Sequence, residues 1–183
     1  GAEHASALLA GFSGVLQVDG YAGYDRQADA TRPGGPLALA YCWSHFRRRF
    51  YDIAKAGNAP IASEALNRIG ALYAVEADIR GCSADERCAE RQARSRPLVE
   101  GLRSWLDEQL TRVSGRSPIA EAMRYGTSHW HGLCRFLDDG RIAIAALSVG
   151  LIARCLDECT AYAKTRETFG QPIGSRQGIA FQI

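Results

Sequence analysis

Apolar residues at helical spacing dominate the middle of the chain, and this pattern restricts the possible folds most. They recur between Ile61 and Ile79, and Gly81 then ends the run. Ser83 and Glu86 have the spacing of a capping box, in which each side chain bonds the backbone N–H group of the other residue. The sequence therefore predicts one helix before the capping box and another after it.

Two prolines mark the helices that follow. Pro97 lies inside the helix predicted after the capping box, and it should split or kink that helix because proline lacks a backbone N–H group. Ser117 followed by Pro118 matches an N-cap with proline at the first helical position. We expect this last helix to continue through Phe136.

Two short apolar runs precede the helices and predict strands. Residues 13–19 are rich in β-forming residues, and Gly20 ends the run. Residues 37–42 form a second run, after which a helix should begin near Ser44 and end at the break in residues 57–60.

Together these elements predict a fold class of α/β plus mostly α, in three parts. Residues 1–57 form a truncated α/β core, residues 58–140 a helical insertion, and residues 141–183 a tail with an apolar helix. A truncated core would leave open sheet edges, which favour oligomerisation.

Composition narrows the cellular setting. The formal net charge of +2 implies no strong field over the whole protein, although local basic patches can exist. The longest apolar candidate, residues 142–153, is shorter than the roughly 18 residues that span a bilayer. The N-terminus resembles no signal peptide, so we expect a cytoplasmic protein with no membrane partner. The six cysteines lack the close pairs typical of zinc sites, and we interpret them as reduced thiols.

Asp19 lies at the predicted carboxyl end of the first strand. It could cap the turn that Gly20 begins. It could instead be a metal ligand, because Mg²⁺ prefers carboxylate oxygens. One Mg²⁺ site draws acids from several distant elements, so Asp19 alone does not decide between the two roles.

A basic and aromatic run follows the second strand, at residues 41–50. Arg47, Arg48 and Arg49 are consecutive, and we expect them near a helix start, where a phosphate backbone would favour them despite the helix dipole. A solvated basic face is the alternative. His45 could contact a phosphate, lie near a metal, or be an ordinary core histidine.

Several segments resemble the insertion-sequence-66 family of DDE transposases. They are Gly11–Tyr24, with Val18-Asp19-Gly20-Tyr21 at its centre, Tyr41–Phe50, and Ser128-His129-Trp130 with the segment that ends at Gly140. The resemblance covers about residues 2–142. It implies DNA as partner, with His45 and Arg47 to Arg49 as DNA contacts, and an RNase H-like core that holds Mg²⁺.

The resemblance also implies three carboxylates around two metal ions, which act together in phosphoryl transfer. Asp19 matches the second acid and is the expected catalytic and metal-binding residue. The first acid belongs upstream of Gly1, and the place of the third is occupied by residues 143–147, which contain no carboxylate. We therefore expect a transposase fragment that is inactive alone.

The end of the chain resembles a second family, the acyl-CoA dehydrogenases, over about residues 140–183. The segment Arg166-Glu167-Thr168-Phe169-Gly170 carries much of this likeness. The resemblance implies that Arg166, Phe169 and Gln177 descend from FAD contacts. Because the flavin-binding β-domain and the catalytic glutamate of that family are missing, we do not expect bound FAD.

The two resemblances meet near residues 138–142, which suggests a chimeric or decayed reading frame. Besides the transposase fragment, two alternatives stay open. One is an acyl-CoA dehydrogenase-like flavoprotein fragment. The other is a non-catalytic helical module that binds DNA, another copy of itself or a full-length transposase.

Overall fold

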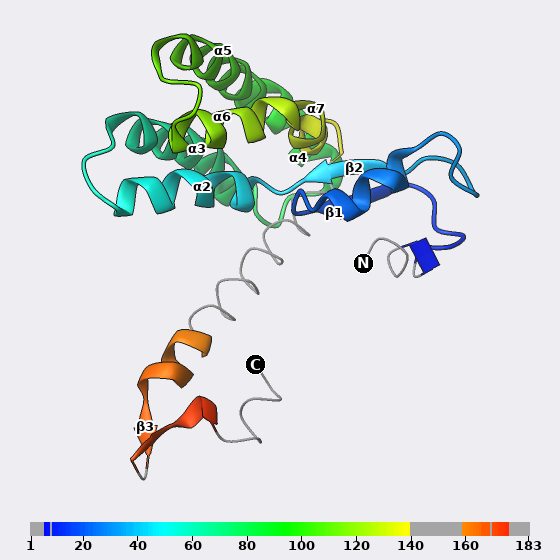
Figure 1. The fold of residues 1–183 in the computed structure, drawn as a ribbon. Coiled ribbons are helices and arrows are strands. Elements are labelled where there is room, and N and C mark those ends of the chain that lie inside the picture. Colours follow the sequence, from blue (N-terminus) through cyan, green and yellow to red (C-terminus); the bar gives the residue numbers. More distant parts are fainter. Residues whose placement is uncertain (1–5, 8, 140–158, 169, 176–183) are drawn as a thin grey trace. The chain divides into compact units, whose positions relative to one another are not determined.

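A computed structural model describes residues 6–7, 9–139, 159–168 and 170–175 of the chain. The chain divides into two compact units, Gly1–Ala146 and Leu147–Ile183. The structure is mostly helical with a few short strands (Figure 1). Among the described residues, no helix has both the length and the apolar character needed to cross a membrane.

The first unit contains two strands and a series of helices, which agrees with most of the predicted elements. The strands are β1 (Val15–Val18) and β2 (Ala38–Tyr41). The helices are α2 (Trp43–Lys55), α3 (Pro60–Asp78), α4 (Ala84–Glu90), α5 (Arg96–Arg112), α6 (Pro118–Ser128) and α7 (Trp130–Cys134). Shorter 3-10 turns span Ala22–Ala28 and Arg135–Leu137, and a π-helical turn spans Arg91–Ser95.

Strands β1 and β2 form a two-stranded parallel sheet, with register from Val15↔Ala38 to Val18↔Tyr41. The 3-10 turn Ala22–Ala28 lies in the connection between them. Because the strands are parallel, both carboxyl ends lie at the same edge of the sheet. This geometry places the turn after β1 beside the start of α2.

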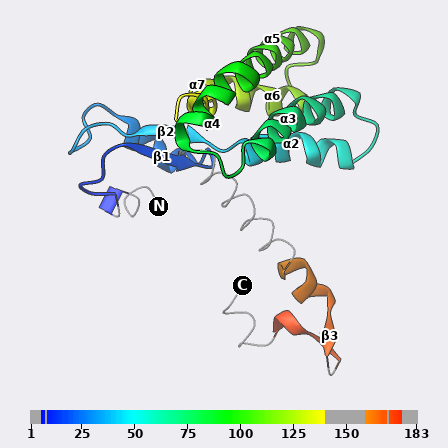
Figure 2. The ribbon, with the colours of Figure 1, turned by 180° about the vertical axis from the view of Figure 1, so that it is seen from behind.

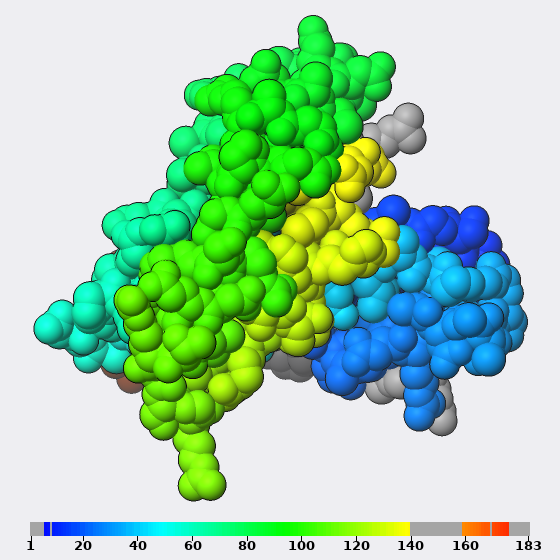
Figure 3. Space-filling view, turned by 90° about the horizontal axis from the view of Figure 1, so that it is seen from above, coloured from blue at the N-terminus to red at the C-terminus, as the bar shows by residue number. Residues whose placement is uncertain are grey.

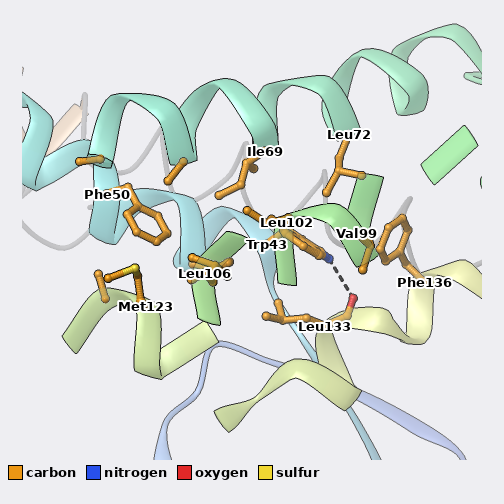
Figure 4. Close-up of a cluster of buried hydrophobic side chains, with 14 of the residues drawn as sticks. Trp43, Phe50, Ile69, Leu72, Val99, Leu102, Leu106, Met123, Leu133 and Phe136 are labelled. Carbon is orange, nitrogen blue, oxygen red and sulfur yellow. Dashed lines mark hydrogen bonds between the residues drawn. The ribbon is translucent and has the colours of Figure 1, made fainter. Parts of the chain in front are cut away.

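Four helices enclose the core of this unit. Helix α2 packs on α3 and α6, and α5 also packs on α3 and α6. Figures 1 and 2 show this group from opposite sides. Figure 4 shows its interior, in which Phe50, Ile69, Leu106 and Met123 come from the four different helices. Trp43, Phe46 and Phe50 of α2 are all buried in this core.

The predicted helix caps are confirmed. Ser83 N donates to Glu86 Oε2 at 2.8 Å, and Glu86 N donates to Ser83 Oγ at 3.3 Å, which completes the capping box. At the start of α6, Ala120 N donates to Ser117 Oγ at 3.3 Å. These caps are local interactions, so the sequence reveals them directly.

The predicted break at Pro97 is present, but it takes the form of a π-helical turn. Residues Arg91–Ser95 form this turn, and Pro97 lies in the first turn of α5 directly after it. Proline needs no hydrogen-bonded N–H group there. The wider turn places Arg91 and Ser95 fully inside the protein.

The prediction of one continuous helix through Phe136 is wrong. Helix α6 ends at Ser128, His129 leaves helical geometry, and α7 begins at Trp130. Helix α7 packs against β2, and the Cα of Gly132 lies so close to the strand that a Cβ there would be 2.8 Å from Leu39 O. The change of direction lets the chain turn back onto the sheet. Figure 3 shows the segment in yellow between the green helices and the blue N-terminal part.

The second unit is described only in part. Residues 159–165 are helical, and β3 (Glu167–Thr168) pairs antiparallel with β4 (Gln171–Pro172). The two strands form a short hairpin. Most of the apolar helix predicted from residue 141 lies outside the described residues.

Gly126 in α6 provides a test of the core packing. A Cβ at this position would overlap the ring of Phe46, which is fully buried. We expect Gly126→Ala to lower the free energy of unfolding by about 1–3 kcal/mol, as overpacked cores do. Gly101→Ala in α5 is the control, because its Cβ would meet no atom within 4 Å. It should raise stability by about 0.5–1 kcal/mol through helix propensity. Urea denaturation measures the free energy of unfolding of both variants. If Gly126→Ala and Gly101→Ala change it in the same direction, the packing of Gly126 against Phe46 is contradicted.

Candidate functional site

Asp19 lies directly after β1 and is exposed at the carboxyl edge of the sheet. Its Oδ1 accepts a hydrogen bond of 3.0 Å from Tyr21 N, so the carboxylate caps the turn as one of the two predicted roles requires. Gly20 has a φ of 90°, and a Cβ there would overlap the Tyr125 ring. This turn therefore needs glycine for both its backbone and its packing.

The start of α2 lies beside this turn. Cys42 N donates to Val18 O at 3.1 Å and extends the parallel pairing to the helix N-cap. His45 follows in the first turn of α2. Its Nδ1 is buried and has no hydrogen-bond partner among the described residues. The histidine therefore lies at the same edge of the sheet as Asp19.

Tyr125 of α6 connects the Asp19 turn to the helices. Its hydroxyl donates to Asp19 O at 2.8 Å, while the Arg49 guanidinium lies over its ring, 4.0 Å from the centroid. Burial raises the pKa of Tyr125 to about 12, the Asp19 carboxylate also raises it, and Arg49 opposes the shift. The phenol thus stays protonated at neutral pH and can keep donating this bond.

His129 packs between two tyrosines. Its ring centroid lies 4.2 Å from that of Tyr41 and 4.7 Å from that of Tyr125. His129 Nδ1 lies 2.7 Å from Tyr125 O. Because a carbonyl only accepts, this contact requires the proton on Nδ1. The ring therefore has a defined orientation beside the Asp19 turn.

The three consecutive arginines point to different neighbours. Arg47 lies near the Tyr51 ring, at 5.9 Å, and Arg48 pairs with Asp52 at 3.8 Å. Arg49 faces Tyr125. Helix α2 begins at Trp43, so these arginines lie in its second turn, where the helix dipole is weaker. Of the three, Arg49 is the one next to the Asp19 turn.

An open surface hollow of about 560 Å³ adjoins this cluster. Its lining residues come from α2, α5, α6 and the α6–α7 junction: Arg49, Arg103, Glu121, Arg124, Tyr125, Thr127, Ser128 and His129. Sequence reasoning missed Tyr125, Arg103 and Arg124, and no spacing in the sequence connects them with Asp19.

Two other acids of the first unit, Asp29 and Asp52, have local roles. Asp29 Oδ1 accepts from Thr31 N and from Thr31 Oγ1, both at 2.8 Å, and these bonds lower its pKa. Asp52 pairs with Arg48. Within the described ranges, no group of three His, Cys, Asp or Glu residues could hold a metal ion. Asp19 and its described neighbours therefore do not fit a two-metal centre by themselves.

The predicted FAD contacts are only partly described. Arg166 N donates to Tyr162 O, and Arg166 O accepts from Ile173 N, each at 2.8 Å. This residue joins the helical segment to the β3–β4 hairpin through its backbone. Phe169 and Gln177 lie outside the described residues.

Comparison with known proteins assigns the two ends of the chain to different families, as the two resemblances in the sequence predict. Residues 1–146 match the family described as Transposase IS66 family, and residues 130–183 match the acyl-CoA dehydrogenase C-terminal domain. The second match is supported by a probable acyl-CoA dehydrogenase of Bacillus subtilis, YngJ, which is 46% identical over 83 residues, 45% of this chain and 22% of its own. No solved structure matches the chain.

Two uncharacterized proteins of Sinorhizobium fredii, y4jD and y4qI, are each 41% identical to the chain. The similarity covers 145 and 147 residues, which are 78% and 79% of this chain but 28% and 27% of the relatives. The chain thus spans little more than a quarter of their length. Since the family match extends over β1, β2 and all the helices around the Asp19 turn, the chain belongs to the IS66 family of transposases, with an acyl-CoA dehydrogenase-like segment at its end.

Proposed function

We propose that this chain is a segment of a DDE transposase that acts on DNA, with an RNase H-like core and Asp19 as one of its metal-binding acids. One observation carries the proposal. In a chain of the IS66 family, an exposed carboxylate follows a parallel strand whose last residue, Val18, is buried, at the edge where the second strand also ends. Acids for metal-dependent phosphoryl transfer need such an exposed position.

The proposed reaction of the whole family protein is Mg²⁺-dependent phosphoryl transfer on DNA. Bound Mg²⁺ would activate the attacking oxygen and stabilise the leaving one. The described residues supply one carboxylate at this edge, and residues 143–147 contain none. We therefore propose that the chain binds DNA but does not cut it unaided, and that a full-length transposase or a second copy is its partner.

The test combines a binding assay and a cleavage assay. The chain should bind duplex DNA with an affinity that falls as salt rises, and it should not nick supercoiled plasmid in Mg²⁺. Asp19→Asn removes a charge from an exposed site, so it should leave both results and the thermal melting temperature nearly unchanged. Mg²⁺-dependent nicking that Asp19→Asn abolishes would show a complete active site. If the chain does not bind DNA, the proposal that it is a segment acting on DNA is rejected.

A flavoprotein fragment is the second candidate, because residues 130–183 match the acyl-CoA dehydrogenase domain. In this candidate Arg166, Phe169 and Gln177 would contact FAD, with the arginine facing the pyrophosphate. A yellow purified protein with a flavin absorbance spectrum would favour this candidate. We propose instead that the tail is a remnant without flavin.

A further inference from the structure

We infer that the basic hollow between α2, α5 and α6 binds a phosphodiester group of the DNA backbone beside Asp19. This inference rests on the proposed function and adds a specific contact site to it. The hollow brings together one arginine from each of three helices, Arg49, Arg103 and Arg124. Two carboxylates oppose these three cations: Glu121, which lines the hollow, and Asp107, which pairs with Arg103 from outside the lining. The surface therefore has excess positive charge, although the net charge of the whole chain is only +2.

Arg49 is oriented but keeps its donors available. Its guanidinium is held over the Tyr125 ring, and 43% of its side chain is exposed. The nearest paired carboxylate oxygen, on Glu121, is 4.0 Å away, which is too long for a hydrogen bond. No guanidinium hydrogen bond from Arg49 occurs among the described residues. A planar donor group fixed by an aromatic ring suits a phosphate, which it can bind with two parallel bonds.

Arg103 of α5 is positioned by several contacts. Its Nε donates to Asp107 at 2.8 Å and its Nη1 to Thr127 O at 3.2 Å, and its guanidinium lies 5.5 Å from the Trp130 ring centroid. These contacts fix the side chain, of which 37% is exposed. Since a guanidinium has five N–H donors, others remain for a ligand.

Arg124 contributes the least compensated charge. Its Nη2 donates to Gly115 O at 2.6 Å, and within the described part of the chain it forms no ion pair. A backbone carbonyl orients this guanidinium without neutralising it. An anion in the hollow would therefore gain charge-assisted hydrogen bonds at a small cost in reorganisation.

The hollow adjoins the proposed reaction centre through Tyr125. The Arg49 guanidinium lies over the face of this ring, and the Tyr125 hydroxyl donates a hydrogen bond to Asp19 O. A strand whose phosphate occupies the hollow would therefore pass next to the turn that presents the Asp19 carboxylate. The hollow is open and larger than one phosphate group, which suits a continuous backbone better than a small free anion.

The experiment measures the affinity of the whole chain for fluorescent duplex DNA at several salt concentrations. Arg49→Gln/Arg124→Gln should weaken binding about a hundredfold, since each lost hydrogen bond to a charged group costs about tenfold in affinity. The slope of log affinity against log salt should fall by about 0.9 for each phosphate that the variant no longer neutralises. Arg124→Gln alone should give a smaller loss of affinity and a smaller fall in the salt slope. Because this side chain is exposed, the variant should fold normally.

The matched control is Arg68→Gln/Arg112→Gln, which removes the same charge from two arginines outside the hollow, the first half-buried and the second exposed. These residues pair with Glu64 and Glu108 on their own helices. If the control weakens binding as much as the hollow variant, the inference is overturned while the proposed function stands. If the unchanged chain binds no DNA, the proposed function itself fails.

Inorganic phosphate distinguishes a DNA backbone from a free anion. At constant ionic strength, millimolar phosphate should displace little of the bound DNA from the unchanged chain. If calorimetry shows that phosphate binds the unchanged chain but not Arg49→Gln/Arg124→Gln, while that variant keeps the DNA affinity of the unchanged chain, the hollow is a site for a free anion and the assignment to DNA is overturned.

Discussion

Arg91→Met should lower the free energy of unfolding by about 3–5 kcal/mol, the usual cost of breaking a buried ion pair by removing one partner. Arg91 is fully buried, and its Nε and Nη2 bind the two carboxylate oxygens of Glu76 at 2.7 and 2.8 Å. Its Nη1 also donates to Phe136 O at 2.9 Å and to Asp139 O at 3.1 Å. The substitution leaves Glu76 charged without its partner and removes the Arg91 donor from two backbone carbonyls. Urea denaturation followed by circular dichroism measures the loss.

Arg94→Met is the matched control on the same π-helical turn. Arg94 also pairs with α3, through Asp78 at 2.6 Å, but both of these side chains are largely exposed. Water screens such a pair, so this variant should unfold close to the wild-type midpoint. The double variant Arg91→Met/Glu76→Met should be more stable than Arg91→Met, because it removes the unpaired charge. Equal losses for Arg91→Met and Arg94→Met would contradict a structural role for the buried pair.

Trp43→Ala should have a comparable effect, with a loss of about 3–5 kcal/mol, as for other large residues removed from a core. Trp43 is 7% exposed, and its ring lies in edge or tilted contact with Phe46, Trp130 and Phe136, at centroid distances of 5.9, 6.0 and 5.9 Å. Its Nε1 donates to Leu133 O at 2.8 Å (Figure 4). One side chain therefore holds α2 against α7, and its removal leaves a cavity at that junction.

Two further variants separate the ring from its hydrogen bond. Trp43→Phe keeps most of the apolar volume but leaves Leu133 O without its donor, which should cost about 1–3 kcal/mol. Trp105→Ala is the control for loss of an indole, because Trp105 is only partly buried at the margin of the same core. Its effect should be clearly smaller than that of Trp43→Ala. The helical circular dichroism signal reports unfolding in each case, and a larger loss for Trp105→Ala would contradict the central place of Trp43.

The sequence predicted the elements well wherever short-range physics decides them. The Ser83–Glu86 capping box, the Ser117 cap and the end of α3 before Gly81 all depend on residues within one helical turn. It predicted less well where a distant segment intervenes. The break at His129 follows from packing of α7 on β2, and the π-helical turn at Arg91 accompanies an ion pair with α3. Neither contact has a signature in the local sequence.

The candidate site also has one part that the local sequence predicts and one part that it does not. Asp19 at the end of a strand could be identified from residues 15–20, and its family resemblance from the motifs on either side. The basic surface beside it could not be predicted, because the run Arg47 to Arg49 diverges on the helix and only Arg49 joins the hollow. Consecutive residues on a helix point in different directions, so a charged run need not form a charged patch.

The sequence by itself therefore determined the family, most of the helices and strands, two helix caps and the aspartate at the end of the first strand, since these depend on local pattern and motif. Only the tertiary structure decided what surrounds that aspartate. Tyr125 bonds Asp19 across 106 residues of sequence and brings Arg49 and the walls of the hollow to the same place. The physical reason is that such long-range contacts arise when α2, α5 and α6 bury their apolar faces together, which no single segment of the chain can specify.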